Sequence, residues 1–249
     1  MESAGLLYEV GRGNDPFLGT HYSFLRELTK LEQSGVTWLS QALGPEFLHH
    51  IYAQAIVQIT GVTADGDAHA GTGLIIAPQW LITCRHVLTD MKLDQKQRAG
   101  DRAFNVIRQL PHPSVDMGLV EVSPPLPPLP GLTFRPPRIA ETVYTLGYPR
   151  VPLSKAPALV IQKGEVTSIG LETIHGDQVF LFSAIARPGN SGGPVLSGNG
   201  HVLGLVAEEL FEDSNNVRSP FFAGIRTDTL SRAIEDLGVK VTLPTETYE

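Results

Sequence analysis

Short apolar segments, bounded by glycine, aspartate or proline, recur along the chain between residues 55 and 207. The chain has 25 glycines and 19 prolines, together 44 of 249 residues, and this frequency interrupts long helices and favours turns. Such punctuation predicts an all-β chain of barrels or a sandwich. The predicted strands are 55–62, 71–77, 81–83, 103–110, 117–122, 142–148, 159–169, 178–186 and a hairpin across Gly198-Asn199-Gly200.

Helical periodicity occurs near the two ends of the chain. Apolar positions between Thr20 and Leu43 recur at helical spacing and predict two amphipathic helices that end at Gly44-Pro45. The stretch from Thr227 to Gly238 predicts a C-terminal helix, with Thr227 or Thr229 as its N-cap.

A proline-rich stretch, Pro124 to Pro137, divides the predicted strands nearly in half. It indicates a semi-rigid connector rather than a ligand for a polyproline-reading domain. We expect a helical extension (1–51), a first β unit (52–123), the connector (124–138) and a second β unit with the C-terminal helix (139–249).

Composition excludes several function classes. The net charge is -7 and the basic residues are scattered, so no nucleic-acid footprint is expected. The single cysteine, Cys84, cannot form an internal disulfide, which favours a reducing compartment. The first residues form no secretory segment, and no apolar run is long enough to span a membrane. We therefore expect a cytoplasmic protein.

The sharpest local motif is Arg-Pro-Gly-Asn-Ser-Gly-Gly-Pro-Val around Ser191. Flanking glycines let the backbone fold tightly beneath a serine hydroxyl, so that peptide N–H groups can point to a developing oxyanion. A plain loop fits the same residues. A catalytic interpretation therefore needs a base and an acid elsewhere in the chain.

Two residues could supply that base and acid. His86 follows the short apolar segment 81–83, which holds its imidazole at the end of a buried strand. Asp116 directly precedes the apolar segment 117–122, where a carboxylate needs a donor. The Nδ1–H of His86 is a candidate donor, and His112 is interpreted as a surface-loop residue.

The order His86, Asp116, Ser191, within TCRHV, DMGLV and PGNSGGPV, resembles the trypsin-like serine peptidase superfamily. The HtrA-type branch is the nearer match, because it shares the GTG segment before the histidine, LGYP at 146–149 and KGEVTSIG at 163–170. The similarity covers roughly residues 52–237. It implies two six-stranded antiparallel β-barrels, with the N-terminal helices and the C-terminal helix added to them.

The resemblance also implies roles. His86 would be the base, Asp116 would orient its imidazole, Ser191 would be the nucleophile, and the N–H groups of Gly189 and Ser191 would form the oxyanion hole. No cofactor is implied, and no His, Cys or Asp cluster has the ligand spacing of a metal site. The rival α/β-hydrolase motif is disfavoured, because its acid and histidine follow the serine and only His201 does so here.

In relatives, the position six residues before the serine forms the floor of the primary substrate pocket. That residue is Ile185 here, with Val206, Ala207 and Ala223 as expected walls. The absence of an acid at the floor favours a small or medium apolar side chain at the cleavage site. An acidic cluster keeps recognition of basic residues open; it comprises Glu208, Glu209, Glu212 and Asp213.

One departure from the family pattern bears on how activity is regulated. Asn190 replaces the aspartate that receives a new N-terminus in many secreted relatives, so activation by N-terminal cleavage is not expected. Control by loop ordering or by a partner remains. The N-terminal helices either pack against the first barrel or dock an activator or oligomer partner. No PDZ domain fits after the C-terminal helix.

The sequence thus predicts a cytoplasmic, cofactor-free serine endopeptidase that acts on polypeptides, without nucleic-acid or membrane partners. Two alternatives remain open. One is an inactive module of the same fold that binds a substrate-like strand in its cleft. The other is a latent protease module of a bacterial signalling or defence assembly.

Overall fold

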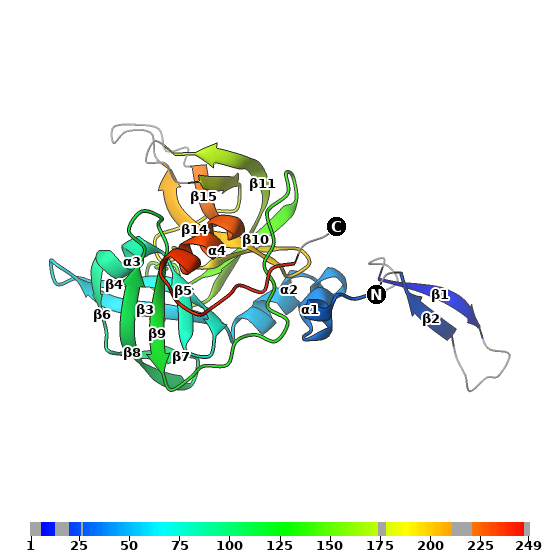
Figure 1. Cartoon of the computed structure of the whole chain (residues 1–249), viewed down its shortest axis with the longest axis horizontal. Helices are drawn as coiled ribbons and strands as arrows, with labels where there is room; N and C mark the ends of the chain where they lie inside the picture. The colour runs from blue at the N-terminus through cyan, green and yellow to red at the C-terminus, as the bar shows by residue number, and fades with distance from the viewer. Residues whose placement is uncertain (1–5, 13–19, 26, 174–177, 211–220, 247–249) are drawn as a thin grey trace.

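The computed structural model describes residues 6–12, 20–25, 27–173, 178–210 and 221–246, with the side chains of 208–210 left aside. Two β units lie against each other, with short helices at their margins (Figure 1). The expected all-β architecture is confirmed. None of the helices in the described ranges has the length and apolar character needed to cross a membrane.

The first β unit is a strongly curled antiparallel sheet with the strand order β6-β3-β4-β5-β9-β8-β7. It has seven strands rather than the six that the resemblance implies: the five predicted segments, and two short segments that were not predicted, β6 and β7, which also pair. The strands are β3 (Ile56–Thr63), β4 (Ala68–Ala77), β5 (Trp80–Thr83), β6 (Met91–Leu93), β7 (Lys96–Ala99), β8 (Arg102–Pro111) and β9 (Gly118–Ser123).

A single buried side chain joins β7 to β3 across this curled sheet. Gln97 Oε1 accepts a hydrogen bond from the Thr60 backbone N–H (3.1 Å), and Gln97 Nε2 donates to the Thr60 carbonyl (2.8 Å). Buried backbone groups need such partners. The side-chain amide of Gln97 therefore takes the place of backbone hydrogen bonds between β3 and β7 and holds the sheet in a barrel-like curve.

The second β unit is a closed antiparallel barrel in the order β10-β11-β12-β15-β14-β13, which confirms the prediction of six strands. Fully buried side chains fill its centre, among them Val143, Phe180, Val195 and Leu203. The strands are β10 (Thr142–Gly147), β11 (Val160–Glu172), β12 (Gln178–Phe182), β13 (Pro194–Ser197), β14 (Val202–Leu210) and β15 (Phe221–Arg226).

The N-terminal extension differs from the two predicted helices. It begins with a hairpin, β1 (Leu7–Arg12) and β2 (Thr20–Phe24), which projects from the body in Figure 1. The helical prediction is therefore wrong for Thr20–Phe24, where cross-strand pairing overrides the helical spacing of apolar residues. The helices that follow are α1 (Lys30–Gln33), the 3₁₀ turn η1 (Thr37–Leu39) and α2 (Ser40–Tyr52).

Gly44-Pro45 is predicted to end a helix, and the backbone confirms this, because α2 consists of two helical segments that meet at Gly44. Gly44 adopts φ 78°, which breaks the helical backbone, and Pro45 begins the next helical segment. A proline is well suited to a first helical position, because its missing N–H is not needed there. The result is a kinked helix whose residues Leu48, Ile51 and Tyr52 pack into the main core.

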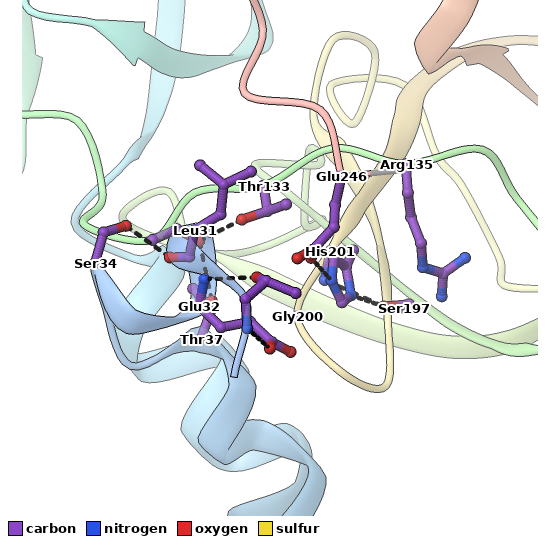
Figure 2. Close-up of polar contacts among 12 residues, drawn as sticks. Leu31, Glu32, Ser34, Thr37, Thr133, Arg135, Ser197, Gly200, His201 and Glu246 are labelled. Carbon is purple, nitrogen blue, oxygen red and sulfur yellow. Dashed lines mark hydrogen bonds and ion pairs between the residues drawn. The ribbon is translucent and has the colours of Figure 1, made fainter. Parts of the chain in front are cut away.

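A buried polar cluster ties the N-terminal extension to the second barrel. His201, between β13 and β14, donates from Nε2 to Glu246 Oε2 in the C-terminal tail (2.9 Å). Glu32 of α1 lies beside them, and ligand-type atoms of all three residues are within 4.8 Å of one another. Figure 2 shows His201 between Ser197 and Glu246. The cluster thus brings together three segments distant in sequence.

The connector is packed rather than extended in solvent. Phe134 is fully buried, and its N–H and carbonyl bond the C-terminal tail at Pro244 and Glu246 (both 2.8 Å). The C-terminal helix is confirmed as α4 (Thr227–Asp236). Its predicted cap is wrong: Arg226 is the N-cap, and the Thr227 hydroxyl donates to the Leu203 carbonyl (2.9 Å) instead.

Candidate active site

His86 and Asp116 meet at one edge of the first β unit. His86 lies in the short helix α3 (Arg85–Thr89), directly after β5, and Asp116 lies in the loop before β9. The His86 Nδ1 is 2.8 Å from Asp116 Oδ2, and the His86 backbone N–H donates to Oδ1 (3.0 Å). A carboxylate at Nδ1 fixes the tautomer that leaves Nε2 as an acceptor. The pairing expected from sequence is present.

The loop that carries Asp116 is organised by a buried histidine. The Nδ1 of His112 accepts hydrogen bonds from the backbone N–H groups of Val115 (2.9 Å) and Ser114 (3.3 Å). His112 is only 3% exposed, so its interpretation as a surface-loop residue is wrong. Its sequence context, between two prolines and close to Asp116, gave no sign of this bonding.

Thr72 of β4 anchors the loop that carries Ser191. Its hydroxyl donates to the Gly189 carbonyl (2.6 Å), and its backbone N–H donates to the Ser191 carbonyl (2.9 Å). Thr72 is fully buried at the contact between the two β units. The loop also requires glycine at position 192, where φ is +83° and an added Cβ would lie 2.2 Å from the Thr72 carbonyl oxygen.

The residues before Ser191 form a type II turn. Asn190 donates its backbone N–H to the Arg187 carbonyl (2.9 Å), and Gly189 at the third position has φ +100°. Proline at the second position and glycine at the third are the residues that this turn prefers. Within the described part of the chain, no hydrogen bond takes the N–H of Gly189 or Ser191.

A pocket of about 210 Å³ contains both Ser191 and His86. We call it the Ser191 pocket. It is also lined by His69, Ala70, Val87, Ala186, Arg187, Pro188, Gly189 and Ala207. The structure therefore brings the serine, the histidine and the Gly189 backbone to one opening, and through His86 it also brings in Asp116.

The four residues predicted for the substrate pocket occupy different places. Ala207 lines the Ser191 pocket, whereas Ile185 is 44% exposed and lines a neighbouring cavity. Val206 and Ala223 are buried. Ala186 and Arg187 line the Ser191 pocket and were missed, although they lie between Ile185 and the serine. The acidic side chains of 208, 209, 212 and 213 lie outside the described residues.

The fold brings together two sets of side chains that sequence spacing did not reveal as possible metal ligands. One is Cys84, His86 and Asp116, and the other is Glu32, His201 and Glu246. In the first set, the Cys84 thiol donates to the Val206 carbonyl (3.1 Å) and His86 Nδ1 pairs with Asp116. Those contacts suit acid–base chemistry at His86. The expectation of a cofactor-free site stays a prediction.

One tyrosine near the site has a shifted pKa. Tyr148 follows β10, and its backbone N–H donates to the Thr72 hydroxyl (3.0 Å). Burial raises the pKa of the Tyr148 phenol above its usual range. This side chain therefore stays neutral at physiological pH and adds no negative charge beside the nucleophile loop.

Comparison with known proteins places this site in a recognised kind of domain. A family model described as a trypsin-like peptidase domain matches residues 71–205, which include His86, Asp116 and Ser191. The serine protease Rv3671c of Mycobacterium tuberculosis is 33% identical over 152 residues, which cover 58% of this chain and 37% of that protein. The uncharacterised protein y4bJ of Sinorhizobium fredii is 31% identical over 145 residues, or 22% of its own length. The chain thus spans well under half of these relatives.

Solved structures agree at the level of fold. The active form of the Rv3671c protease matches with a TM-score of 0.63 and 24% identity, covering 80% of this chain and 86% of that chain. The HtrA-type protease AlgW, solved with a tripeptide, matches with a TM-score of 0.60 and 20% identity, covering 78% and 62%. The resemblance inferred from the three sequence motifs is confirmed.

Proposed function

Since the chain belongs to the trypsin-like peptidase family, we propose that it is a serine endopeptidase that hydrolyses peptide bonds in polypeptide substrates. The observation that carries this proposal is the His86–Asp116 pair, with Nδ1 and Oδ2 2.8 Å apart, at the pocket that holds Ser191. A serine hydroxyl is a weak nucleophile until a neighbouring base takes its proton. His86, held in one tautomer by Asp116, is that base.

In the acylation step, Ser191 Oγ attacks the carbonyl carbon of the scissile bond while His86 Nε2 takes the hydroxyl proton. The oxyanion that forms is stabilised by the N–H groups of Gly189 and Ser191. The tetrahedral intermediate then collapses, the C–N bond breaks, and His86 returns the proton to the leaving amine. An acyl-enzyme on Ser191 remains.

Deacylation repeats these steps with water. His86 Nε2 takes a proton from water, the resulting hydroxide attacks the acyl carbon, and the second intermediate releases the carboxylic acid. Ser191 recovers its proton from His86, so the enzyme is regenerated without a cofactor. Asp116 stabilises the imidazolium in both steps and stays ionised.

The type II turn over 187–190 supports an oxyanion hole that is formed before substrate binds. Thr72 holds the Gly189 carbonyl at 2.6 Å, which restrains this turn from the other β unit. Preorganised donors of this kind contribute strongly because they need no reorganisation during the reaction. Control of activity by a partner acting on the N-terminal extension stays a prediction.

The test is hydrolysis of a mixed fluorogenic peptide pool by the purified chain and by Ser191→Ala. We expect the substitution to lower turnover by a factor on the order of 10⁶, as complete loss of a triad serine does in subtilisin. Ser231→Ala is the matched control, because α4 contributes no residue to the Ser191 pocket. Equal hydrolysis by wild type and Ser191→Ala would contradict the proposal.

A further inference from the structure

Two larger cavities adjoin the Ser191 pocket, and cationic side chains line them. One, of about 570 Å³, is lined by Arg150 and Lys155 and includes Asp94. The other, of about 640 Å³, is lined by Arg150 and Arg187 and has no acidic residue in its lining. Arg187 lines both this second cavity and the Ser191 pocket. The described linings of these two cavities thus carry more basic than acidic side chains, in a chain whose net charge is -7.

Arg187 is the group of this surface that is nearest in sequence to the nucleophile. It is exposed, and within the described residues neither Arg187 nor Arg150 forms an ion pair or a side-chain hydrogen bond. The one acid in these linings, Asp94, accepts a hydrogen bond from the Thr60 hydroxyl (2.6 Å) in the cavity that Arg187 does not line. The Arg187 guanidinium therefore keeps its donors for a ligand.

The rest of the Ser191 pocket is small and neutral where it meets Arg187. Ala186 and Ala207 form its walls, so methyl groups leave space next to the guanidinium. Ile185, the expected apolar floor, lies in the neighbouring cavity instead. Within the described residues, Arg187 is the one arginine or lysine that lines the Ser191 pocket.

We infer that the enzyme prefers a glutamate or aspartate as the residue whose carbonyl Ser191 attacks, with Arg187 binding its carboxylate. An arginine fork matches a carboxylate in geometry and charge, and such charge-assisted hydrogen bonds are stronger than neutral ones. Arg150, on the wall shared by the two larger cavities, extends the same attraction to acidic residues farther along the peptide. This inference rests on the proposed peptidase function and names its substrate class.

The experiment compares kcat/KM for peptides that differ only at that position, with Glu, Gln, Ala, Leu or Lys. We expect wild type to favour Glu over Gln by about tenfold, at the lower end of what a hydrogen bond to a charged group contributes. Arg187→Gln should abolish this ratio, so that the Glu and Gln peptides are hydrolysed with equal kcat/KM whatever the overall rate. Arg187→Glu should shift the preference to Lys.

Two controls separate this inference from folding defects and from the function itself. Arg232→Gln removes a cation from α4, outside the three cavities, and should keep the wild-type Glu:Gln ratio. Raising the salt concentration should lower that ratio for wild type, because salt screens exposed charges. Hydrolysis with preference for Leu, Lys or Gln, or a Glu preference that Arg187→Gln leaves intact, would overturn the inference alone. No hydrolysis of any peptide would instead overturn the proposed function.

Discussion

At the scale of single residues, Thr72 shows how one side chain can couple the two β units at the site. It bonds Gly189 and Ser191 in the second unit while its own carbonyl accepts from the Thr83 hydroxyl (2.7 Å) in the first. His86 lies three residues after Thr83. The base and the nucleophile loop are therefore positioned from one buried strand pair, β4 and β5.

Removing the Thr72 hydroxyl should impair catalysis without removing a reacting group. Thr72→Val keeps the side-chain shape but leaves the Gly189 carbonyl without its 2.6 Å partner, so the restraint on the oxyanion turn is lost. We expect kcat to fall by about 10- to 100-fold, less than the roughly 10²- to 10³-fold loss on removal of an oxyanion donor because the donors themselves remain, with a small change in KM. Thr72→Ser should restore most of kcat. Full activity in Thr72→Val would show that the turn holds without Thr72.

The residues that sequence reasoning identified and missed differ in a physical way. His86, Asp116 and Ser191 lie in short sequence motifs, and the neighbouring residues in each motif indicate the chemical role. Thr72 instead acts through contacts across a long sequence separation, and the roles of His112 and Arg187 depend on where one side chain points in the folded chain. Only the folded chain specifies such contacts, as the 117-residue separation of Thr72 and Gly189 illustrates.

At the scale of elements, α2 anchors the N-terminal extension to the hairpin that follows the nucleophile. The Tyr52 hydroxyl donates to the Gly200 carbonyl (2.6 Å), and the Ser40 hydroxyl donates to the Gly198 carbonyl (3.1 Å). Tyr52 is fully buried, and burial raises the pKa of its phenol, so it remains a donor at all relevant pH values. The α2 part of the extension thus belongs to the folded body, whereas the β1–β2 hairpin projects from it.

Tyr52→Phe should destabilise the chain by leaving the Gly200 carbonyl short of a partner in a buried site. We expect a loss of about 1–3 kcal/mol in the free energy of unfolding, the cost of one buried unsatisfied polar group. Urea unfolding measures it. Tyr144→Phe in β10 is the control, because the Tyr144 hydroxyl forms no hydrogen bond within the described residues. Equal stability of Tyr52→Phe and wild type would refute the anchoring role of the hydroxyl.

The elements that the sequence predicted well are those with strong β-branched or apolar alternation and clear turn residues, such as β3, β4 and the β13–β14 hairpin. Strands β6 and β7 were missed because each is at most four residues long, and β7 has charged or amide side chains at three of its four positions. Strand β2 was mistaken for helix because Phe24 fits the helical spacing of Leu28 and Leu31. The choice between helix and strand for such residues depends on which other segment pairs with them, and the local sequence does not specify that segment.

At the scale of the whole molecule, the Glu32–His201–Glu246 cluster joins the N-terminal extension, the second barrel and the C-terminal tail. Burial lowers the pKa of His201, Arg135 adds to this lowering, and the two glutamates oppose it. The folded-state pKa lies below the ordinary value of about 6.5. Between the folded-state pKa and this ordinary value, the unfolded state therefore binds more protons than the folded state. The free energy of unfolding thus falls as the pH drops through that range.

We expect the free energy of unfolding to be lower at pH 5 than at pH 7.5, with His201 responsible for part of the difference. His201→Gln should reduce the stability of the chain at pH 7.5 and also reduce its loss on acidification, because the group that must protonate is gone. Urea unfolding of both proteins at the two pH values measures this. An unchanged pH dependence in His201→Gln would assign the acid sensitivity to other groups.

The central claim is that His86, Ser191 and the N–H groups of Gly189 and Ser191 form an assembled catalytic site in the isolated chain. The most direct measurement is intact-mass labelling by a fluorophosphonate, which phosphonylates a serine only where base and oxyanion hole are both in place. We predict one label per chain for wild type and none for Ser191→Ala or His86→Ala. An unlabelled wild type, or labelling that persists in Ser191→Ala, would contradict the account.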